Sequence, residues 1–355
     1  MDAQTAFRTP VRAVSGLIAD AMATAGLPPD DARKIADLML EADLTGADAH
    51  GVFRLPQYVA RLRMGAINPH PSIKVTRSAP ATALVDGDNG MGHLVVARAM
   101  ESAIEMAREC GVAWVGARMS NHAGAAGVYA ALALEADMVG LYAAVASANH
   151  MPLDGGAEPV LGTNPLAVAI PAGEEPPVVL DIATSIVSYG TIKNHRLQNV
   201  PLQPGWMVNP ETGEAVLDPQ ASGGALLLPM GGYKGAGLAL MLGLLAGTLN
   251  GALFGRDCID FNTDPGKVTN TGQFVVALDP ARFQPLDQFK AEVDRHAREL
   301  RASNALPGRR VRLPGDGRAQ RRADRLANGL ALAPELIAQL DKLADELAIL
   351  PLRHR

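Results

Sequence analysis

The sequence predicts an α/β protein with a mixed central region at about residues 76–279 and a helical lobe built from both chain ends. In the central region, short apolar runs typical of strands alternate with stretches of helical periodicity. Charged amphipathic patterns lie on either side, which predicts a helical segment over 1–75 and another over 280–355 that packs with it. There is no G-x-G-x-x-G between a strand and a helix and no G-x-x-x-x-G-K-[ST] loop, so no Rossmann or P-loop phosphate turn is expected.

The composition of the 355 residues is that of a folded soluble chain, with 48% hydrophobic and 19% charged residues. A net charge of −5 gives no general attraction to nucleic acid or to an anionic membrane, so neither partner is expected. Cys110 and Cys258 fit no metal or redox spacing, and no cluster of His, Asp or Glu predicts a metal site. The N-terminus has no apolar signal segment, and the uncharged stretch 235–255 is interpreted as a buried helix, so we expect a cytoplasmic protein.

Three helical patterns open the chain. Two of them cover residues 10–47 and are separated by the breaker Gly26–Pro29, after which Asp30 is expected to cap the second helix. The third covers residues 50–64 and ends before the turn Asn68–Pro71.

The central region alternates runs of β-branched and small apolar residues with helical patterns. Strands are predicted at 73–75, 83–85, 112–116, 139–146, 167–170, 178–180 and near 273–278, and helices at about 93–109, 124–136 and 235–255.

The C-terminal region has charged amphipathic patterns that predict helices over 285–303 and 333–350. Between them lies a basic run that begins at Arg309–Arg312 and continues through Arg318 and Arg321. Two interpretations of this run remain, a solvated helix face and a local phosphate site.

Two glycine-rich segments are candidates for anion binding. Gly231–Gly237 precedes the apolar helix, and Ser120–Gly124 lies between a strand and a helix. Each is either a simple turn or a helix N-terminus whose N–H groups hold an anion, with Lys234 assisting in the first case.

The segment around His50 is the richest candidate for catalysis. If it is helical, His50, Arg54 and Tyr58 are four residues apart and share a face, although Pro56 limits the regularity of that helix. Imidazole, guanidinium and phenol together suit proton transfer to a carbonyl and fork binding of a carboxylate. The same spacing is also common on a solvated surface.

Six segments in fixed order then resemble the malate/L-lactate dehydrogenase type 2 family. They are the segments around His50, Ser120–His122, Leu161–Pro165, Leu180–Ser185, Tyr233–Gly235 and Leu313–Gly315. The resemblance extends over essentially the whole chain, and the relatives include ureidoglycolate, diketogulonate and sulfolactate dehydrogenases and cyclic-imine reductases. It implies a non-Rossmann NAD(P)-binding α/β fold, NAD or NADP as the cofactor, a small carboxylate substrate and a homodimer.

The resemblance also implies roles for the residues that match the family motifs. His50 would give the proton to the carbonyl or imine, Asp181 would support it, and His122 competes with His50 for that role. Of the expected substrate-binding residues, Arg54 and Thr163 match family motifs, whereas Tyr58 is included because it would share a helix face with His50 and Arg54. The expected cofactor contacts are His122, Gly124, Val179, Asp181, Ile182, Ala183, Thr184, Ser185, Tyr233, Lys234, Pro314, Gly315 and Asp316.

The chain departs from the family pattern at Ala49, where the family usually has a serine before the catalytic histidine. Without that hydroxyl, a Ser–His–Asp relay is excluded, while a His50–Asp181 pair remains. The expected reaction is hydride transfer between a nicotinamide and C2 of a 2-hydroxy or 2-oxo acid. A cyclic-imine carboxylate reductase, whose substrate is already protonated near neutral pH, and a non-catalytic nucleotide-binding protein are the alternatives. Of the other histidines, His70, His93, His296 and His354 are expected to be structural or solvated, and His150 and His195 are unassigned.

Overall fold

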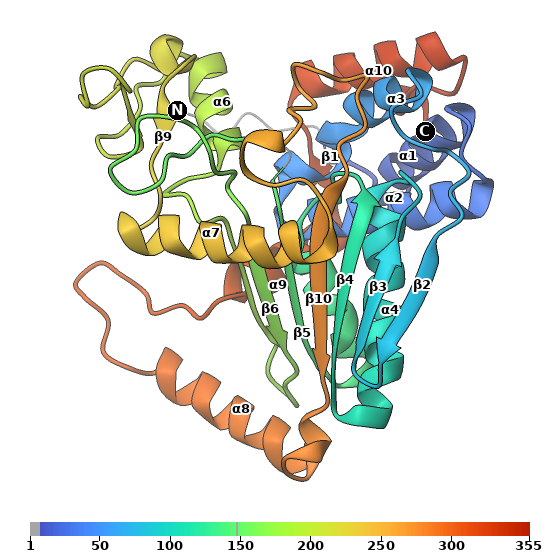
Figure 1. The fold of residues 1–355 in the computed structure, drawn as a ribbon, viewed down its shortest axis with the longest axis vertical. Helices are drawn as coiled ribbons and strands as arrows, with labels where there is room; N and C mark the ends of the chain where they lie inside the picture. Colours follow the sequence, from blue (N-terminus) through green and yellow to red (C-terminus); the bar gives the residue numbers. More distant parts are fainter. Residues whose placement is uncertain (1–7, 147) are drawn as a thin grey trace.

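The computed structural model describes residues 8–146 and 148–355 and has the α/β architecture that the sequence predicts (Figure 1). A seven-stranded mixed sheet with the order β2-β3-β4-β10-β5-β6-β7 forms its centre. These strands are β2 (Lys74–Ala79), β3 (Thr82–Asp86), β4 (Val112–Ser120), β5 (Val139–Ala144), β6 (Leu166–Ile170), β7 (Val178–Ile182) and β10 (Thr271–Leu278). Two small sheets pair β1 (Arg8–Thr9) with β11 (Leu330–Ala331), and β8 (Met207–Val208) with β9 (Leu226–Leu227).

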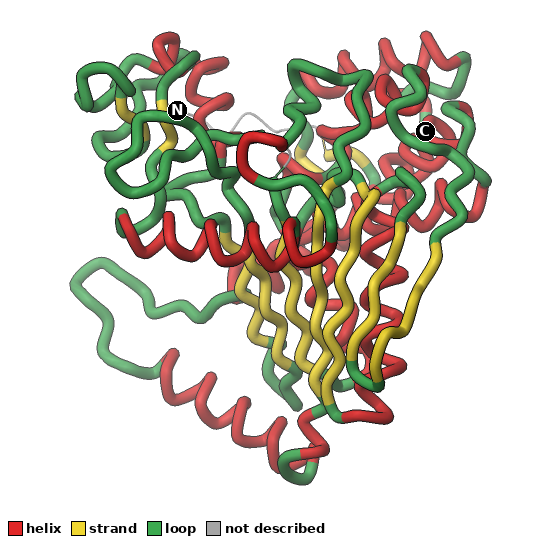
Figure 2. The backbone as a smooth tube through the Cα atoms, viewed as in Figure 1, coloured by secondary structure: helices red, strands yellow, loops and turns green. Residues whose placement is uncertain are grey.

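The helices lie on both faces of the large sheet and above one of its ends (Figures 1 and 2). They are α1 (Val11–Thr24), α2 (Pro29–Thr45), α3 (Leu55–Arg63), α4 (Gly92–Cys110), α5 (Ala126–Leu132), α6 (Tyr189–Gln198), α7 (Tyr233–Ala246), α8 (Leu286–Arg301), α9 (Asp316–Asn328) and α10 (Pro334–Leu347). Two short 3-10 helices, η1 (Asp48–His50) and η2 (Val52–Arg54), precede α3. Among the residues that the structure describes, none of the helices is long and apolar enough to span a membrane.

Side-chain alternation along the central strand β10 explains why the sheet is covered on both faces. Val275 belongs to a core shared with α4 and α5, whereas the adjacent Phe274 packs with Leu242 of α7 on the other face. A strand that is buried on both faces has a continuous apolar sequence, as residues 274–278 of β10 do.

The strand directions bring several chain segments to one edge of the sheet. Strands β4 and β5 are both antiparallel to β10, which lies between them, and β6 separates β5 from β7 in the same way. The C-terminal ends of β4, β5 and β7 therefore meet the N-terminal ends of β6 and β10. Figure 2 shows the helices and loops of two lobes above this end of the strands.

Both chain ends contribute to a helical lobe, as predicted. Its core combines Leu17 of α1, Ile35 of α2 and Leu55 of α3 with Leu340 of α10, and each of these side chains is fully buried. Burying such a leucine or isoleucine stabilises the fold by about 1.5–3 kcal/mol, so both ends of the chain contribute to one core.

Helix α8 lies elsewhere. Figure 1 shows it beyond the opposite end of the sheet from α1 and α10, although the sequence places residues 280–355 with the N-terminal helices. The reason is its chemistry, because α8 buries only Asp294 and Ala297 and has no wide apolar face to bury in the lobe. The domain limits at 75 and 279 stay predictions.

Three local predictions need correction. Pro28, rather than Asp30, precedes α2 as its cap residue, and no side chain caps this helix. The segment 235–255 is α-helical only to the end of α7, after which a 3-10 turn covers Thr248–Asn250, and it is not buried all round, since Met241 is 52% exposed. Only one face of α7 packs on the sheet.

Candidate active site

A cleft of about 660 Å³ lies at this sheet edge, between the helical lobe and the segment that contains α6. Its volume is in the range of small-ligand sites. Of the predicted site residues, those that line it are His50, Arg54, His122, Gly124, Thr163, Val179, Asp181, Ala183 and Gly315. The predicted site residues outside the lining are Tyr58, Ile182, Thr184, Ser185, Tyr233, Lys234, Pro314 and Asp316.

The turn that carries His50 and Arg54 is built around Gly51, which interrupts the continuous helix expected there. The buried carboxylate of Asp43 accepts a hydrogen bond of 2.8 Å from the N–H of Val52. That carboxylate occupies the space that a Cβ on residue 51 would need. Gly51 is therefore required for the close approach that fixes both functional side chains.

Two hydrogen bonds fix the orientation of the Arg54 guanidinium. Its Nε donates to the carbonyl oxygen of Ala49 and its Nη1 to Oε1 of Gln57, each at 2.9 Å. Since Arg54 also lines the cleft, it presents a fixed, planar donor group that matches a carboxylate.

The loop that carries His122 is held through the buried side chain and backbone of Asn121. The Nδ2 of Asn121 donates to the carbonyl oxygen of Gly90 at 2.9 Å, and its Oδ1 accepts from Arg61 at 3.0 Å. Nε2 of Gln273 donates to the backbone carbonyl of Asn121 at 3.0 Å. These contacts come from three parts of the chain, so the loop is fixed before any ligand arrives.

Two donors converge on Nδ1 of His122. The Tyr58 hydroxyl lies 2.6 Å from it, and the N–H of Gly124 donates to it at 3.3 Å. A backbone N–H can only donate, and burial raises the pKa of Tyr58, which keeps its phenol protonated. Nδ1 is therefore an acceptor, and the ring proton of neutral His122 is on Nε2. Tyr58, expected to contact substrate, lies outside the cleft lining and has Nδ1 of His122 as a hydrogen-bond partner.

Tyr58 packs against His93, which is buried, and against His122, which together with the neighbouring His50 is half-buried at the cleft. The ring centroids of His50 and His122 are 5.6 Å apart, and His93 packs edge-on against Tyr58 at 5.3 Å. Burial, with a smaller effect of Arg54, lowers the pKa of His50 to about 4. Burial and His50 lower the pKa of His93 to about 3, and burial also lowers the pKa of His122. All three rings are therefore neutral at pH 7.

Asp181 has partners other than His50. Its carboxylate accepts a hydrogen bond of 2.8 Å from the N–H of Gly127 and lies 3.9 Å from Nη1 of Arg318. Nδ1 of His50 is buried without a hydrogen-bond partner among the described residues. The structure thus associates Asp181 with α9 rather than with the histidines.

The loop before α9 lies directly against β7. The N–H of Val179 donates to the carbonyl oxygen of Pro314 at 3.2 Å, and Gly315 has a φ of +98°. A Cβ on Gly315 would lie only 3.0 Å from the backbone nitrogen of Val179. Arg318 and Arg321 follow in the first turns of α9 and line the cleft, which favours the phosphate interpretation of the basic run.

Tyr233 and Lys234 are not brought into the cleft. Both begin α7, and Tyr233 is 66% exposed. The residues just before them are joined to the segment that follows β7, because the N–H of Met230 donates to the carbonyl oxygen of Thr184 at 2.9 Å.

The start of α6 forms a cleft wall that the sequence analysis missed. Ser188 caps this helix by accepting a hydrogen bond of 3.1 Å from the N–H of Thr191. Only Ile192 of α6 is buried, so the helix has no apolar periodicity. The Ser188 cap was the one local signal that indicated it.

Three side chains at this wall add aromatic surface and a positive charge to the cleft. The rings of His150 and Tyr189 are stacked, with centroids 3.8 Å apart, and Nζ of Lys193 lies 5.6 Å from the centroid of Tyr189. Burial, and next the positive charge of Arg54, lower the pKa of Lys193. A second cation therefore lies within electrostatic range of Arg54.

Comparison with known proteins agrees with this geometry. Residues 10–341 match the family model described as malate/L-lactate dehydrogenase. The chain is 34% identical to a malate dehydrogenase from Pyrococcus horikoshii, with 96% of each chain covered. It is 34% identical to a Delta(1)-pyrroline-2-carboxylate reductase from Ancylobacter novellus, over 92% of this chain and 94% of the relative.

A third relative has a solved structure. The L-sulfolactate dehydrogenase from Methanocaldococcus jannaschii is 35% identical in sequence over 94% of this chain and 95% of its own. Superposition on the solved sulfolactate dehydrogenase from that organism gives a TM-score of 0.89 at 33% identity, over 98% of this chain and 99% of the other.

The fold, the cleft and the dehydrogenases and reductases that the chain matches define an oxidoreductase. The chain belongs to the malate/L-lactate dehydrogenase family. This confirms the resemblance seen in the sequence motifs, and it sets aside the alternative of a non-catalytic nucleotide-binding protein.

Proposed function

We propose that this enzyme transfers a hydride between a nicotinamide cofactor, NAD or NADP, and C2 of a small 2-hydroxy or 2-oxo acid. The observation that carries the proposal is the presence of the Arg54 guanidinium and two neutral imidazoles, His50 and His122, in the lining of one cleft. The names of the malate and sulfolactate dehydrogenase relatives support the same substrate class.

The part of the cleft near α9 fits a dinucleotide. Nη2 of Arg318 is buried without a hydrogen-bond partner among the described residues, and Gly315 lets β7 and the α9 N-terminus approach each other closely. Arg318, Arg321 and the backbone around Gly315 would hold the phosphates there, with Asp181 beside them. The bound nicotinamide supplies the hydride or accepts it.

The other part of the cleft fits a small anion. Arg54 would bind the carboxylate next to the reacting carbon through paired hydrogen bonds. Lys193 would attract a second negative charge, because it lines the same cleft and is close enough to Arg54 for their charges to interact. This arrangement favours a 2-oxo dicarboxylate over a monocarboxylate.

His122 is better placed than His50 to provide the proton in the direction of reduction. Its Nε2–H bond would break as the substrate oxygen gains the proton, and Tyr58 would return a proton to Nδ1 over 2.6 Å. Burial disfavours the resulting phenolate, and the positive charges of Arg54 and Arg61 would offset part of that cost until solvent in the cleft returns the proton. His50 has a pKa of about 4, so at pH 7 it is a neutral imidazole like His122, but its Nδ1 has no hydrogen-bond partner among the described residues that could return a proton to it.

Reduction of a cyclic-imine carboxylate is the second candidate, and Ala49 is the observation that favours it. Ala49 lines the cleft beside His50 without a hydroxyl that could take part in proton transfer. An imine nitrogen that is already protonated needs only the hydride and a carboxylate partner. The pyrroline-2-carboxylate reductase among the relatives supports this alternative.

A screen that follows the absorbance of the reduced nicotinamide tests both candidates. Pyruvate, oxaloacetate and a pyrroline carboxylate would each be offered with NADH and with NADPH. We expect the highest kcat/KM with oxaloacetate; the imine giving the highest value would select the second candidate. Turnover of His50→Ala at the wild-type rate with every substrate would remove His50 from the catalytic residues.

We also propose a cytoplasmic homodimer. The outer face of α7 supports self-association, because it exposes Met241, Leu244 and Leu245 by 38–52%. Light scattering of the wild type and of Met241→Lys tests the assembly, with a monomeric wild type as the contrary result. Cell fractionation tests the location.

A further inference from the structure

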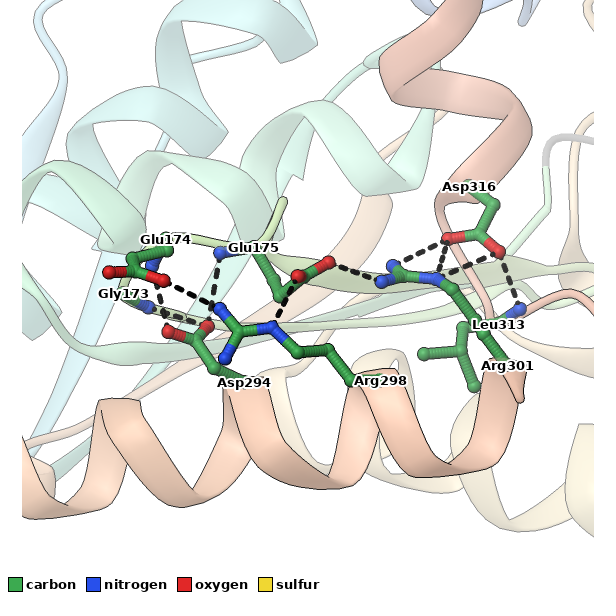
Figure 3. A network of polar contacts seen from close by, with 8 residues as sticks. All are labelled: Gly173, Glu174, Glu175, Asp294, Arg298, Arg301, Leu313 and Asp316. Carbon is green, nitrogen blue, oxygen red and sulfur yellow. Dashed lines mark hydrogen bonds and ion pairs between the residues drawn. The ribbon is translucent and has the colours of Figure 1, made fainter. Parts of the chain in front are cut away.

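Helix α8 is attached to the body of the protein mainly through charged side chains. Figure 3 shows a continuous chain of polar contacts from the middle of α8 to the start of α9. The helix buries only Asp294 and Ala297, so apolar packing contributes little to its position.

Asp294 anchors the helix to the turn between β6 and β7. Its carboxylate accepts hydrogen bonds from three successive backbone N–H groups, those of Gly173, Glu174 and Glu175, at 2.8–3.1 Å. The side chain of Asp294 is buried, and Gly173 has no room for a Cβ because Oδ2 of Asp294 lies in that space. This turn is thus held rigidly against α8.

Arg301 continues the network from this turn to α9. Nη1 of its guanidinium pairs with the carboxylate of Glu175, and Nη2 donates to Oδ1 of Asp316 at 2.8 Å. All three side chains are only 21–23% exposed, so salt and water weaken these pairs less than they weaken a surface pair. Asp316 also accepts a hydrogen bond of 2.9 Å from the N–H of Leu313.

The carboxylate of Asp316 therefore closes the loop of residues 313–316. The next contacts of this loop are those of Pro314 and Gly315 with Val179, directly at the lining of the cleft. Arg318 and Arg321 follow within two turns of the same helix. The position of the cleft arginines is thus linked through Asp316 and Arg301 to α8.

We propose that α8 holds the phosphate-binding end of the cleft in place, and that Arg301 is the residue that positions the 313–316 loop. Asp316 accordingly acts through Arg301 and Leu313, rather than by touching the cofactor as its family motif implies. The proposal rests on the proposed cofactor site, since it assigns α8 to that site.

The test compares Arg301→Ala with Arg295→Ala. Arg295 lies on the same helix, and its side-chain partners among the described residues are Glu292, Glu299 and His296, so its loss leaves the network intact. We expect Arg301→Ala to raise the Kd of the reduced nicotinamide dinucleotide about tenfold, a typical effect for a residue that couples to a site through a network. The KM for the oxo acid at saturating cofactor should stay within about twofold of the wild type, because Arg54 is remote from the network.

Hydrogen exchange of the same proteins gives a second readout. Amides of residues 310–316 should exchange faster in Arg301→Ala and unchanged in Arg295→Ala, while those of residues 120–124 stay protected in both. Faster exchange with an unchanged Kd would overturn the positioning role, as would unchanged exchange. A wild type that binds no dinucleotide would refute the proposed function instead, and exchange would still decide whether Arg301 holds the loop.

Discussion

The two parts of the cleft are built from opposite kinds of interaction. Around Tyr58, the buried His93 and the half-buried His50 and His122 are neutral because desolvation lowers their pKa values. Around α9, the side chains stay charged and are ordered by ion pairs such as Arg301–Asp316. One region controls a proton by excluding water, and the other controls anion binding by orienting charges.

This difference predicts different sensitivities. Substitutions and pH changes in the histidine region should affect the proton-transfer step and the stability at acid pH. Changes in the charged region should affect cofactor affinity and should depend on salt. The experiments below test these expectations for one region or for both.

The largest effect is expected from His122→Gln. Loss of the Nε2 proton donor should lower kcat for oxo-acid reduction about 10³-fold, within the range for a positioned general acid, with little change in the Kd of the cofactor. His195→Gln is the matched control, because His195 lies outside the cleft and its Nδ1 faces the carbonyl oxygens of Val200 and Pro201. A fall in kcat below tenfold would return the role to His50.

Tyr58→Phe should have the second largest effect. Without its hydroxyl, His122 loses the partner that fixes its tautomer and restores its proton, so kcat should fall about 10²-fold. Nitrogen chemical shifts of His122 should show the loss of the single Nε2–H tautomer. A wild-type kcat in this variant would mean that His122 is supplied with protons by another route.

These two variants concern a contact that the sequence could not reveal. The motifs identified His50, Arg54 and His122 as cleft residues, and the alternation of strands and helices predicted the sheet. The four-residue spacing of His50, Arg54 and Tyr58 also placed Tyr58 on the substrate side, because that interpretation assumes a continuous helix. Gly51 breaks that helix for a reason that lies outside the segment, namely the carboxylate of Asp43.

The charged region was harder to predict for a similar reason. Helix α8 has the periodicity of a lobe helix, but its position depends on Asp294 meeting a turn more than one hundred residues earlier in the chain. The wall of α6 was missed because it buries a single residue. Contacts between polar groups leave no periodic signal in a sequence, whereas apolar packing does.

His93→Gln tests the histidine region through stability. When folding lowers the pKa of a base, the unfolded chain binds a proton that the folded chain does not. The free energy of unfolding is therefore highest above the unfolded pKa and decreases as the pH falls below it. His93 has a folded pKa of about 3 and an ordinary value of 6.5. Between about pH 6 and pH 4 the variant should therefore lose about 1.4 kcal/mol less per pH unit than the wild type.

Urea unfolding at several pH values measures how the free energy of unfolding of the wild type and of His93→Gln changes with pH. Asp43, whose pKa burial raises to about 7, contributes a slope of opposite sign, but it is the same in both proteins and cancels in the difference. Equal slopes would mean that His93 is protonated in the folded protein, which its burial argues against.

The smallest effect is expected from salt on the charged region. Raising NaCl from about 0.05 M to 0.5 M shortens the screening length severalfold and weakens the pairs of α8, such as Arg298 with Glu174, which is 84% exposed. Exposed pairs are each worth only about 0.2–1 kcal/mol, so amides of residues 302–315 should exchange a few-fold faster rather than become unprotected. Residues 120–124 should not change, because Asn121 is held by buried hydrogen bonds that salt does not screen. Equal acceleration in both segments would mean that the two parts of the cleft open together, and the distinction between them would then be one of chemistry and not of stability.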